Sequence, residues 1–223
     1  MSDHMPLFLV LSPLKSELKV ILERIEQKNF TLQKLGDVYV CPEARLMLAA
    51  SGHGKVQTAL NTQKILLLHP QIKDAFLIGA AGALKAGVKP RDVVVATKSI
   101  EHDYRLLFIS KPLPEILSPH DYAASLSPIG DFGLHIGPIA SGDEDIVNTE
   151  RAAELQAKTQ ALAVAWEGAG FARACQNCQV AWTEIRAVTD EADHKAVDSF
   201  KANLEPAMNN AFDVFWKILT VDE

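Results

Sequence analysis

Residues 161–190 read ALAVAWEGAGFARACQNCQVAWTEIRAVTD and contain two predicted strands, the apolar run 161–165 and the largely apolar segment 180–188. Runs of this length without polar alternation are typical of strands buried on both faces. We interpret the segment between them, 168–178, as a helix. Continuous apolar strands that alternate with helices favour an α/β fold with a mainly parallel sheet covered on both sides.

The rest of the chain continues this alternation. An apolar strand at 7–11 is followed by Ser12-Pro13, an N-cap residue and a proline at the first helical position, and then by apolar residues at helical spacing as far as Ile25. The closely spaced strands that follow indicate a mixed sheet. No linker or repeat divides the chain, so we predict one domain over residues 1–223. We expect further strands at 31–35, 37–41, 46–50, 75–78, 93–96 and 134–140, helices at 56–68, 148–159 and from 197 onward with a kink at Pro206, and an irregular loop between 111 and 128.

The composition argues against several classes of function. Of the 223 residues, 48% are apolar, which is enough for the core of one domain. Lysine and arginine number 22 against 28 acidic residues, so the formal charge is −6, and the lack of a basic run argues against nucleic-acid binding. The apolar stretch at 6–11 is too short for a membrane span or a signal peptide. We therefore expect a cytoplasmic protein of enzyme size, with either Met1 or Met5 as its first residue.

The cysteines and histidines give no metal or redox motif. Three cysteines are too few for a disulfide framework, and the lone pair Cys175-x-x-Cys178 is better explained by packing than by zinc or redox chemistry. The seven histidines have no paired metal spacing, and His102-Asp103 is more readily a structural pair. The glycine motifs of phosphate-binding and dinucleotide-binding loops are also absent from the sequence.

Three carboxylates and one glycine-containing turn follow predicted strands. Glu17 comes after the first strand, Glu167 after 161–165, Asp190 after 180–188, and the turn 79–82 after 75–78. Ligands bind at the carboxyl ends of the strands in open α/β sheets, so we expect these groups to meet at one edge. Each carboxylate also has a structural interpretation: Glu17 as a solvated helix residue, and the other two as caps of the helices that follow.

These junctions, taken in order, resemble the nucleoside phosphorylase/nucleosidase superfamily, and within it most closely the 5'-methylthioadenosine/S-adenosylhomocysteine nucleosidase family. The resemblance covers nearly the whole chain. It rests on the order and spacing of short motifs, since no single one is diagnostic. The motifs are SGHGKV at 51–56, GAAG at 79–82, HD at 102–103, SGD at 141–143, AVAWEGA at 163–169 and RAVTDEAD at 186–193.

The resemblance implies a three-layer α/β sandwich around a mixed, partly barrel-like sheet, a homodimer, and no metal or organic cofactor. It also implies hydrolysis of the N-glycosidic bond of a purine nucleoside, 5'-methylthioadenosine or a related 5'-modified adenosine, as in methionine salvage. The roles that it carries over are purine protonation by Asp190, water activation by Glu17, ribose binding by Glu167, a sugar contact by Trp166, a turn contact by Gly82, a backbone contact to the base by Ile146, and places in the substrate site for Asp145 and Arg186.

This chemistry explains why carboxylates in different environments are needed. Cleavage passes through an oxocarbenium-like centre that nearby anionic groups stabilise. The purine leaves readily only when protonated, so one carboxyl must hold a proton near neutral pH, which burial favours. A second carboxylate must stay ionised to take a proton from water.

Four positions depart from the family pattern. Asp145 stands where an aromatic residue usually stacks on the adenine, Ala80 replaces a common serine, Ala165 replaces an acid, and Trp166 replaces methionine. Because an aspartate offers no stacking surface, we expect base recognition to differ from that of the standard enzyme, with Trp166 supplying the aromatic surface and Asp145 pointing away.

Three other functions stay open. A phosphorylase would need arginines around the anomeric carbon, whereas the first strand leads to Pro13-Leu14-Lys15 and Glu17 would repel phosphate. A silent nucleoside-binding protein would not need all three carboxylates. Hydrolysis of futalosine-type nucleosides, which carry a bulky aromatic acid at the 5' position, is a further alternative.

Overall fold

The computed structural model describes residues 5–104, 107–108, 111–122 and 126–221, so the segment 1–4 that separates the two possible start residues lies outside it. Its helices are α1 (Lys15–Gln27), α2 (Lys55–Leu68), α3 (Thr149–Thr159), α4 (Gly168–Cys178) and α5 (Ala196–Val221). Its strands are β1 (Phe8–Ser12), β2 (Gln33–Leu35), β3 (Val38–Cys41), β4 (Leu46–Ala50), β5 (Asp74–Ala83), β6 (Val93–Glu101), β7 (Glu115–Leu117), β8 (Leu134–Ser141), β9 (Ala163–Ala165) and β10 (Ala181–Asp190).

The strands form one mixed sheet in the order β10-β6-β8-β9-β5-β1-β4-β3-β2, with β7 paired to β6. An additional parallel pairing joins β10 to β5. Because β5 also pairs with β9, the strands β5, β10, β6, β8 and β9 close into a barrel. The predicted α/β sandwich with a mixed, partly barrel-like sheet is confirmed.

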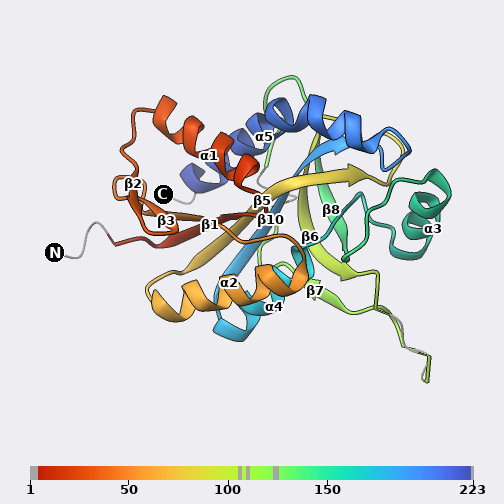
Figure 1. Cartoon of the computed structure of the whole chain (residues 1–223), viewed down its shortest axis with the longest axis horizontal. Coiled ribbons are helices and arrows are strands. Elements are labelled where there is room, and N and C mark those ends of the chain that lie inside the picture. Colours follow the sequence, from red (N-terminus) through yellow and green to blue (C-terminus); the bar gives the residue numbers. More distant parts are fainter. Residues whose placement is uncertain (1–4, 105–106, 109–110, 123–125, 222–223) are drawn as a thin grey trace.

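Helices cover both faces of the sheet. Figure 1 shows α1 and α5 on one side, α2 and α4 on the other, and α3 at the end beside β8. Successive side chains of a strand point to opposite faces. In β1, Val10 accordingly packs with residues of α1 and α5, whereas Leu9 and Leu11 pack with residues of α4. Burial on both faces explains why strands such as β1 and β4 are almost continuously apolar.

Several predicted boundaries are wrong, for reasons of long-range pairing. The segment 79–82 is not a turn, because β5 continues to Ala83 along β10. Helix α1 begins at Lys15 with Leu14 as its N-cap, while Ser12 is the last residue of β1 and pairs with Ala50. Strand β6 extends to Glu101, and the predicted irregular loop contains β7.

The described residues hold free cysteines at positions 41, 175 and 178, and burial raises the pKa of the Cys175 thiol well above its usual value. Cys175 packs in the apolar cluster between the sheet and α4, as expected from its motif. The same residues contain no cluster of His, Cys, Asp and Glu side chains that could hold a metal ion. None of the described helices is long and apolar enough to cross a membrane.

Candidate active site

A cavity of about 330 Å³ lies at the carboxyl ends of β1, β5, β9 and β10. It brings together segments that are far apart in the sequence, because β1, β5 and β10 are parallel and end at the same edge of the sheet, and the short strand β9 runs antiparallel beside the end of β5. Helix α5 and the loop before α3 complete its wall. Of the predicted site residues, the cavity lining includes Glu17, Gly82, Asp145, Ile146, Trp166, Glu167 and Asp190.

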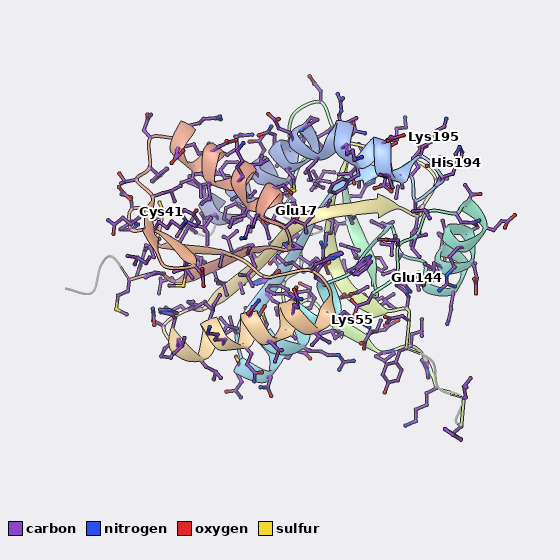
Figure 2. The ribbon with its side chains drawn as sticks, in the orientation of Figure 1. Glu17, Cys41, Lys55, Glu144, His194 and Lys195 are labelled. Atoms are coloured by element: carbon purple, nitrogen blue, oxygen red, sulfur yellow. The ribbon has the colours of Figure 1, made fainter. Side chains whose placement is uncertain are left out.

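Glu17 lies in the first turn of α1 and is only 2% exposed. One carboxylate oxygen accepts the Leu14 amide at 2.7 Å and the other accepts the Ala80 amide of β5 at 2.8 Å. Burial, with a smaller contribution from the charge of Glu167, raises its pKa to about 7 against these hydrogen bonds. Figure 2 shows Glu17 where α1 meets the strands. Glu17 is therefore a buried carboxylate that can exchange a proton near neutral pH, and the interpretation as a solvated helix residue is wrong.

Asp190 is the last residue of β10. Its Oδ1 accepts the Ala192 amide at 2.9 Å and its Oδ2 accepts the Thr189 hydroxyl at 2.8 Å. Burial raises its pKa, and these two hydrogen bonds oppose the shift. Gly82 lies opposite Asp190 in the neighbouring strand, and a Cβ at position 82 would lie 2.8 Å from Oδ1. The glycine thus makes room for the carboxyl group within β5, at a point where the register with β10 shifts, rather than forming a turn.

Glu167 precedes α4 and is 3% exposed. Its Oε1 accepts the Gly54 amide at 3.2 Å, and its Oε2 accepts two nitrogens of Arg186 at 3.2 Å each. Arg186 is not among the lining residues: it is fully buried behind the cavity wall. The predicted place of Arg186 in the substrate site is therefore corrected, since it holds a site carboxylate instead.

A fourth buried carboxylate beside these three, Glu184, is not indicated by the sequence analysis. It accepts the Arg186 Nε at 2.8 Å, and burial raises its pKa although the guanidinium opposes the shift. In the sequence Glu184 is an ordinary strand residue, and only its spacing of two from Arg186, which places both side chains on one face of the strand, could have indicated the pair.

The loop that carries Asp145 and Ile146 is fixed at both sides. Ahead of it, the Asp143 carboxylate accepts the Lys55 amide at 2.8 Å, and the Asp143 amide donates to Asp103 at 3.0 Å. Behind it, Arg151 of α3 binds both carboxylate oxygens of Glu144, which lies between α3 and the strands in Figure 2. Within this loop Ile146 is buried and Asp145 is exposed.

A second aromatic side chain at the site, His53, was also missed. Its ring stacks on that of Trp166 with centroids 4.1 Å apart and planes 16° apart, and both residues line the cavity. Gly54, at φ +87°, turns the chain so that its amide reaches Glu167, which sets His53 against the residue before that glutamate. The flanking glycines of SGHG, after a strand that ends at the same edge, were the available signal.

Known proteins similar to this chain belong to one superfamily. The family model described as Phosphorylase superfamily matches residues 8–220. This chain belongs to the phosphorylase superfamily. Among curated members, the aminodeoxyfutalosine nucleosidase of Helicobacter pylori strain J99 is 30% identical over 215 residues, with 91% of this chain and 93% of the relative covered. The 5'-methylthioadenosine/S-adenosylhomocysteine nucleosidase of Thermotoga maritima is 27% identical, with 89% and 91% covered.

Solved structures of the superfamily have the same fold. The 5'-methylthioadenosine/S-adenosylhomocysteine nucleosidase of S. pneumoniae with a transition-state inhibitor matches with a TM-score of 0.83 and 27% identity, covering 97% of this chain and 99% of that one. The futalosine hydrolase of Helicobacter pylori strain 26695 matches with a TM-score of 0.81 and 27% identity over the whole of both chains.

Proposed function

We propose that this protein is a nucleosidase that hydrolyses the N-glycosidic bond of a purine nucleoside modified at its 5' position. The observation that carries the proposal is the meeting of three buried carboxylates, Glu17, Glu167 and Asp190, in one cavity at the sheet edge. Each has different partners, and different environments let carboxyl groups divide acid and base roles.

In the proposed mechanism Asp190 delivers a proton to the purine. Its raised pKa favours the protonated form that this step needs. Glu17, with a pKa of about 7, is ionised in a substantial fraction of molecules at neutral pH and takes a proton from the attacking water. Glu167, fixed by Gly54 and Arg186, accepts hydrogen bonds from the ribose hydroxyls. The anionic site also stabilises the oxocarbenium-like centre.

Two classes of substrate agree with the similarities. The relatives include enzymes named for 5'-methylthioadenosine and S-adenosylhomocysteine, and others named for aminodeoxyfutalosine. All are nucleosidases by name, so the glycosidic bond is the shared target. A role in methionine salvage would follow from the first class. A futalosine-type nucleoside is the second candidate substrate. The similarity to the aminodeoxyfutalosine nucleosidase of Helicobacter pylori strain J99 favours it.

Water rather than phosphate is the proposed nucleophile. Phosphate binding calls for several cationic donors at the anomeric carbon. Within the described part of the chain, the lining of this cavity holds one lysine, Lys201, and no arginine. The buried carboxylate of Glu17 would also repel an incoming phosphate.

We also propose that the protein is a homodimer and that it is cytoplasmic. The outward face of α2 supports this assembly, because it exposes several large apolar side chains that a second copy would cover. These side chains are Val56, Leu60, Leu67 and Leu68.

The proposal is tested by incubating the purified protein with 5'-methylthioadenosine and with aminodeoxyfutalosine and measuring released base and sugar. We expect free base from at least one of them. Binding without base release from either would favour the silent nucleoside-binding protein.

A further inference from the structure

Glu184 is a buried carboxylate that the proposed mechanism does not use. It is fully buried on β10, where its Oε1 accepts the Arg186 Nε at 2.8 Å. Its other oxygen forms no hydrogen bond of normal geometry with a described residue, although the Ser99 hydroxyl lies near enough to favour the charged form. Removing a carboxylate from water is costly, and one hydrogen bond offsets only part of that cost. The role of Glu184 therefore lies in its bond with Arg186.

The fold makes room for this bond on both sides of the pair. Glu184 and Arg186 are two residues apart in β10, so their side chains lie on the same face of the strand. A Cβ at Gly168 would lie 2.3 Å from the Glu184 Oε2, and a Cβ at Gly79 would lie 2.9 Å from the Arg186 Nη1. Both glycines are therefore needed where the pair lies. Gly168 directly follows Glu167, so Glu184 lies against the start of α4.

The bond at Nε decides where the rest of the guanidinium points. Nε joins the planar guanidinium to its stem, so a hydrogen bond there fixes the rotation that places Nη1 and Nη2. These two nitrogens donate to the Glu167 Oε2 at 3.2 Å each, and Nη1 also donates to the Ala80 carbonyl at 3.3 Å. The Ala80 amide in turn donates to Glu17. The shortest of these guanidinium bonds is therefore the one to Glu184, which is not among the residues that line the cavity.

We propose that Glu184 is a positioning residue for ribose recognition, which directs Nη1 and Nη2 of Arg186 to Glu167 and so fixes the carboxylate that receives the ribose hydroxyls. Because Glu184 does not line the cavity, it acts on the ligand only through Arg186. The inference rests on the proposed function, since that function assigns the ribose hydroxyls to Glu167. Removing the acceptor at position 184 should therefore weaken recognition of the hydroxyls and leave recognition of the base unchanged.

The test compares adenosine with 2',3'-dideoxyadenosine, which differ only in the two ribose hydroxyls. Binding is measured by calorimetry on Asp190→Asn, in which turnover is expected to be blocked. Adenosine should bind at least about tenfold more tightly, because hydrogen bonds to a charged group are strong. Adding Glu184→Leu, which leaves Nε without an acceptor, should reduce this affinity ratio by at least about fivefold. Glu184→Gln should keep the ratio within about twofold of the parent, because its amide oxygen still accepts from Nε.

Two controls separate positioning from a general loss of structure. Free adenine has no ribose, so its affinity should be the same with and without Glu184→Leu. Asp213→Leu removes the carboxylate that binds Arg24 between α1 and α5, outside the cavity lining, and should leave the affinity ratio unchanged. Should Glu184→Leu not fold, Glu184→Asp replaces it: its carboxylate is one methylene shorter and withdraws from Nε, so the ratio should fall by at least about threefold.

Several results would overturn the inference. An affinity ratio near one in the parent, or one that survives both Glu184→Leu and Glu184→Asp, is the first. Equal weakening of adenosine, 2',3'-dideoxyadenosine and adenine is the second, because Glu184 would then act on the fold alone. A ratio lost as fully in Glu184→Gln as in Glu184→Leu is the third, because the acceptor for Nε would not be the cause. Failure of the proposed function is a separate result: the wild-type protein would release no base from any nucleoside, while the binding ratio is still measured.

Discussion

Arg186 holds Glu167 through two nitrogens, Nη1 and Nη2, which both lie 3.2 Å from the same carboxylate oxygen. Its third nitrogen, Nε, donates to Glu184 at 2.8 Å. One fully buried guanidinium thus binds two buried carboxylates, and the free oxygen of Glu167 is taken by the Gly54 amide. The position of Glu167 is consequently set by Arg186 beneath the cavity and by Gly54 at the start of α2.

Removing the Arg186 guanidinium should lower the free energy of unfolding. Arg186→Met leaves two buried carboxylates without their partner, which typically destabilises a protein by about 3–5 kcal/mol. Arg173→Met is the matched control, because Arg173 is half exposed and its ion pair with Glu101 should contribute less than about 1 kcal/mol. Urea unfolding measures the free energy of unfolding of each variant. Equal losses in the two variants would contradict the role given to Arg186.

Asp190→Asn should abolish base release and leave nucleoside binding within about tenfold, because the amide keeps the shape of the side chain but cannot deliver the proton. Base release in a spectrophotometric assay and calorimetric binding provide the two measurements. Near-normal turnover in the folded variant would show that another group protonates the base.

The buried carboxyl of Glu17 should make stability depend on pH. Its pKa is about 7 in the folded protein against 4.5 for the free side chain, so the folded state binds more protons between these values. Stability is therefore lost as pH rises from about 4.5 to 7, by about 3 kcal/mol for the full shift. Glu17→Gln does not titrate. Its stability relative to wild type should increase by about this amount between about pH 4 and pH 8, and a pH-independent difference between the two would contradict the assignment.

Asp145→Phe should strengthen the binding of the base. Asp145 is exposed and lines the cavity, so a phenyl ring there can stack on a purine, a contact of about 1–3 kcal/mol. We expect at least about fivefold higher affinity for adenosine and 5'-methylthioadenosine, and no change for Asp145→Asn. If the phenylalanine variant leaves affinity and substrate ranking untouched, Asp145 is outside the base site.

The sequence predicts the fold from strand periodicity, and it predicts the meeting of Glu17 and Asp190 because both follow parallel strands that end at one edge. Glu167 reaches the same cavity by another route, since it follows β9, which runs antiparallel to β5. It does not predict the contacts that depend on pairing between distant segments. The His53–Trp166 stack depends on the bond from Gly54 to Glu167, which are 113 residues apart. The sequence also predicts a turn at Gly82, because the pairing that extends β5 comes from β10, more than a hundred residues later.

The most direct test of the account follows the oxygen that ends on the sugar. The reaction is run in oxygen-18-labelled water, with and without phosphate, on whichever nucleoside the protein cleaves, and the sugar product is analysed by mass spectrometry. Hydrolysis predicts one labelled oxygen on the free sugar and a rate that does not depend on phosphate. Glu17→Gln should lower that rate sharply without loss of folding. An unlabelled sugar 1-phosphate, formed only when phosphate is present, would contradict the account.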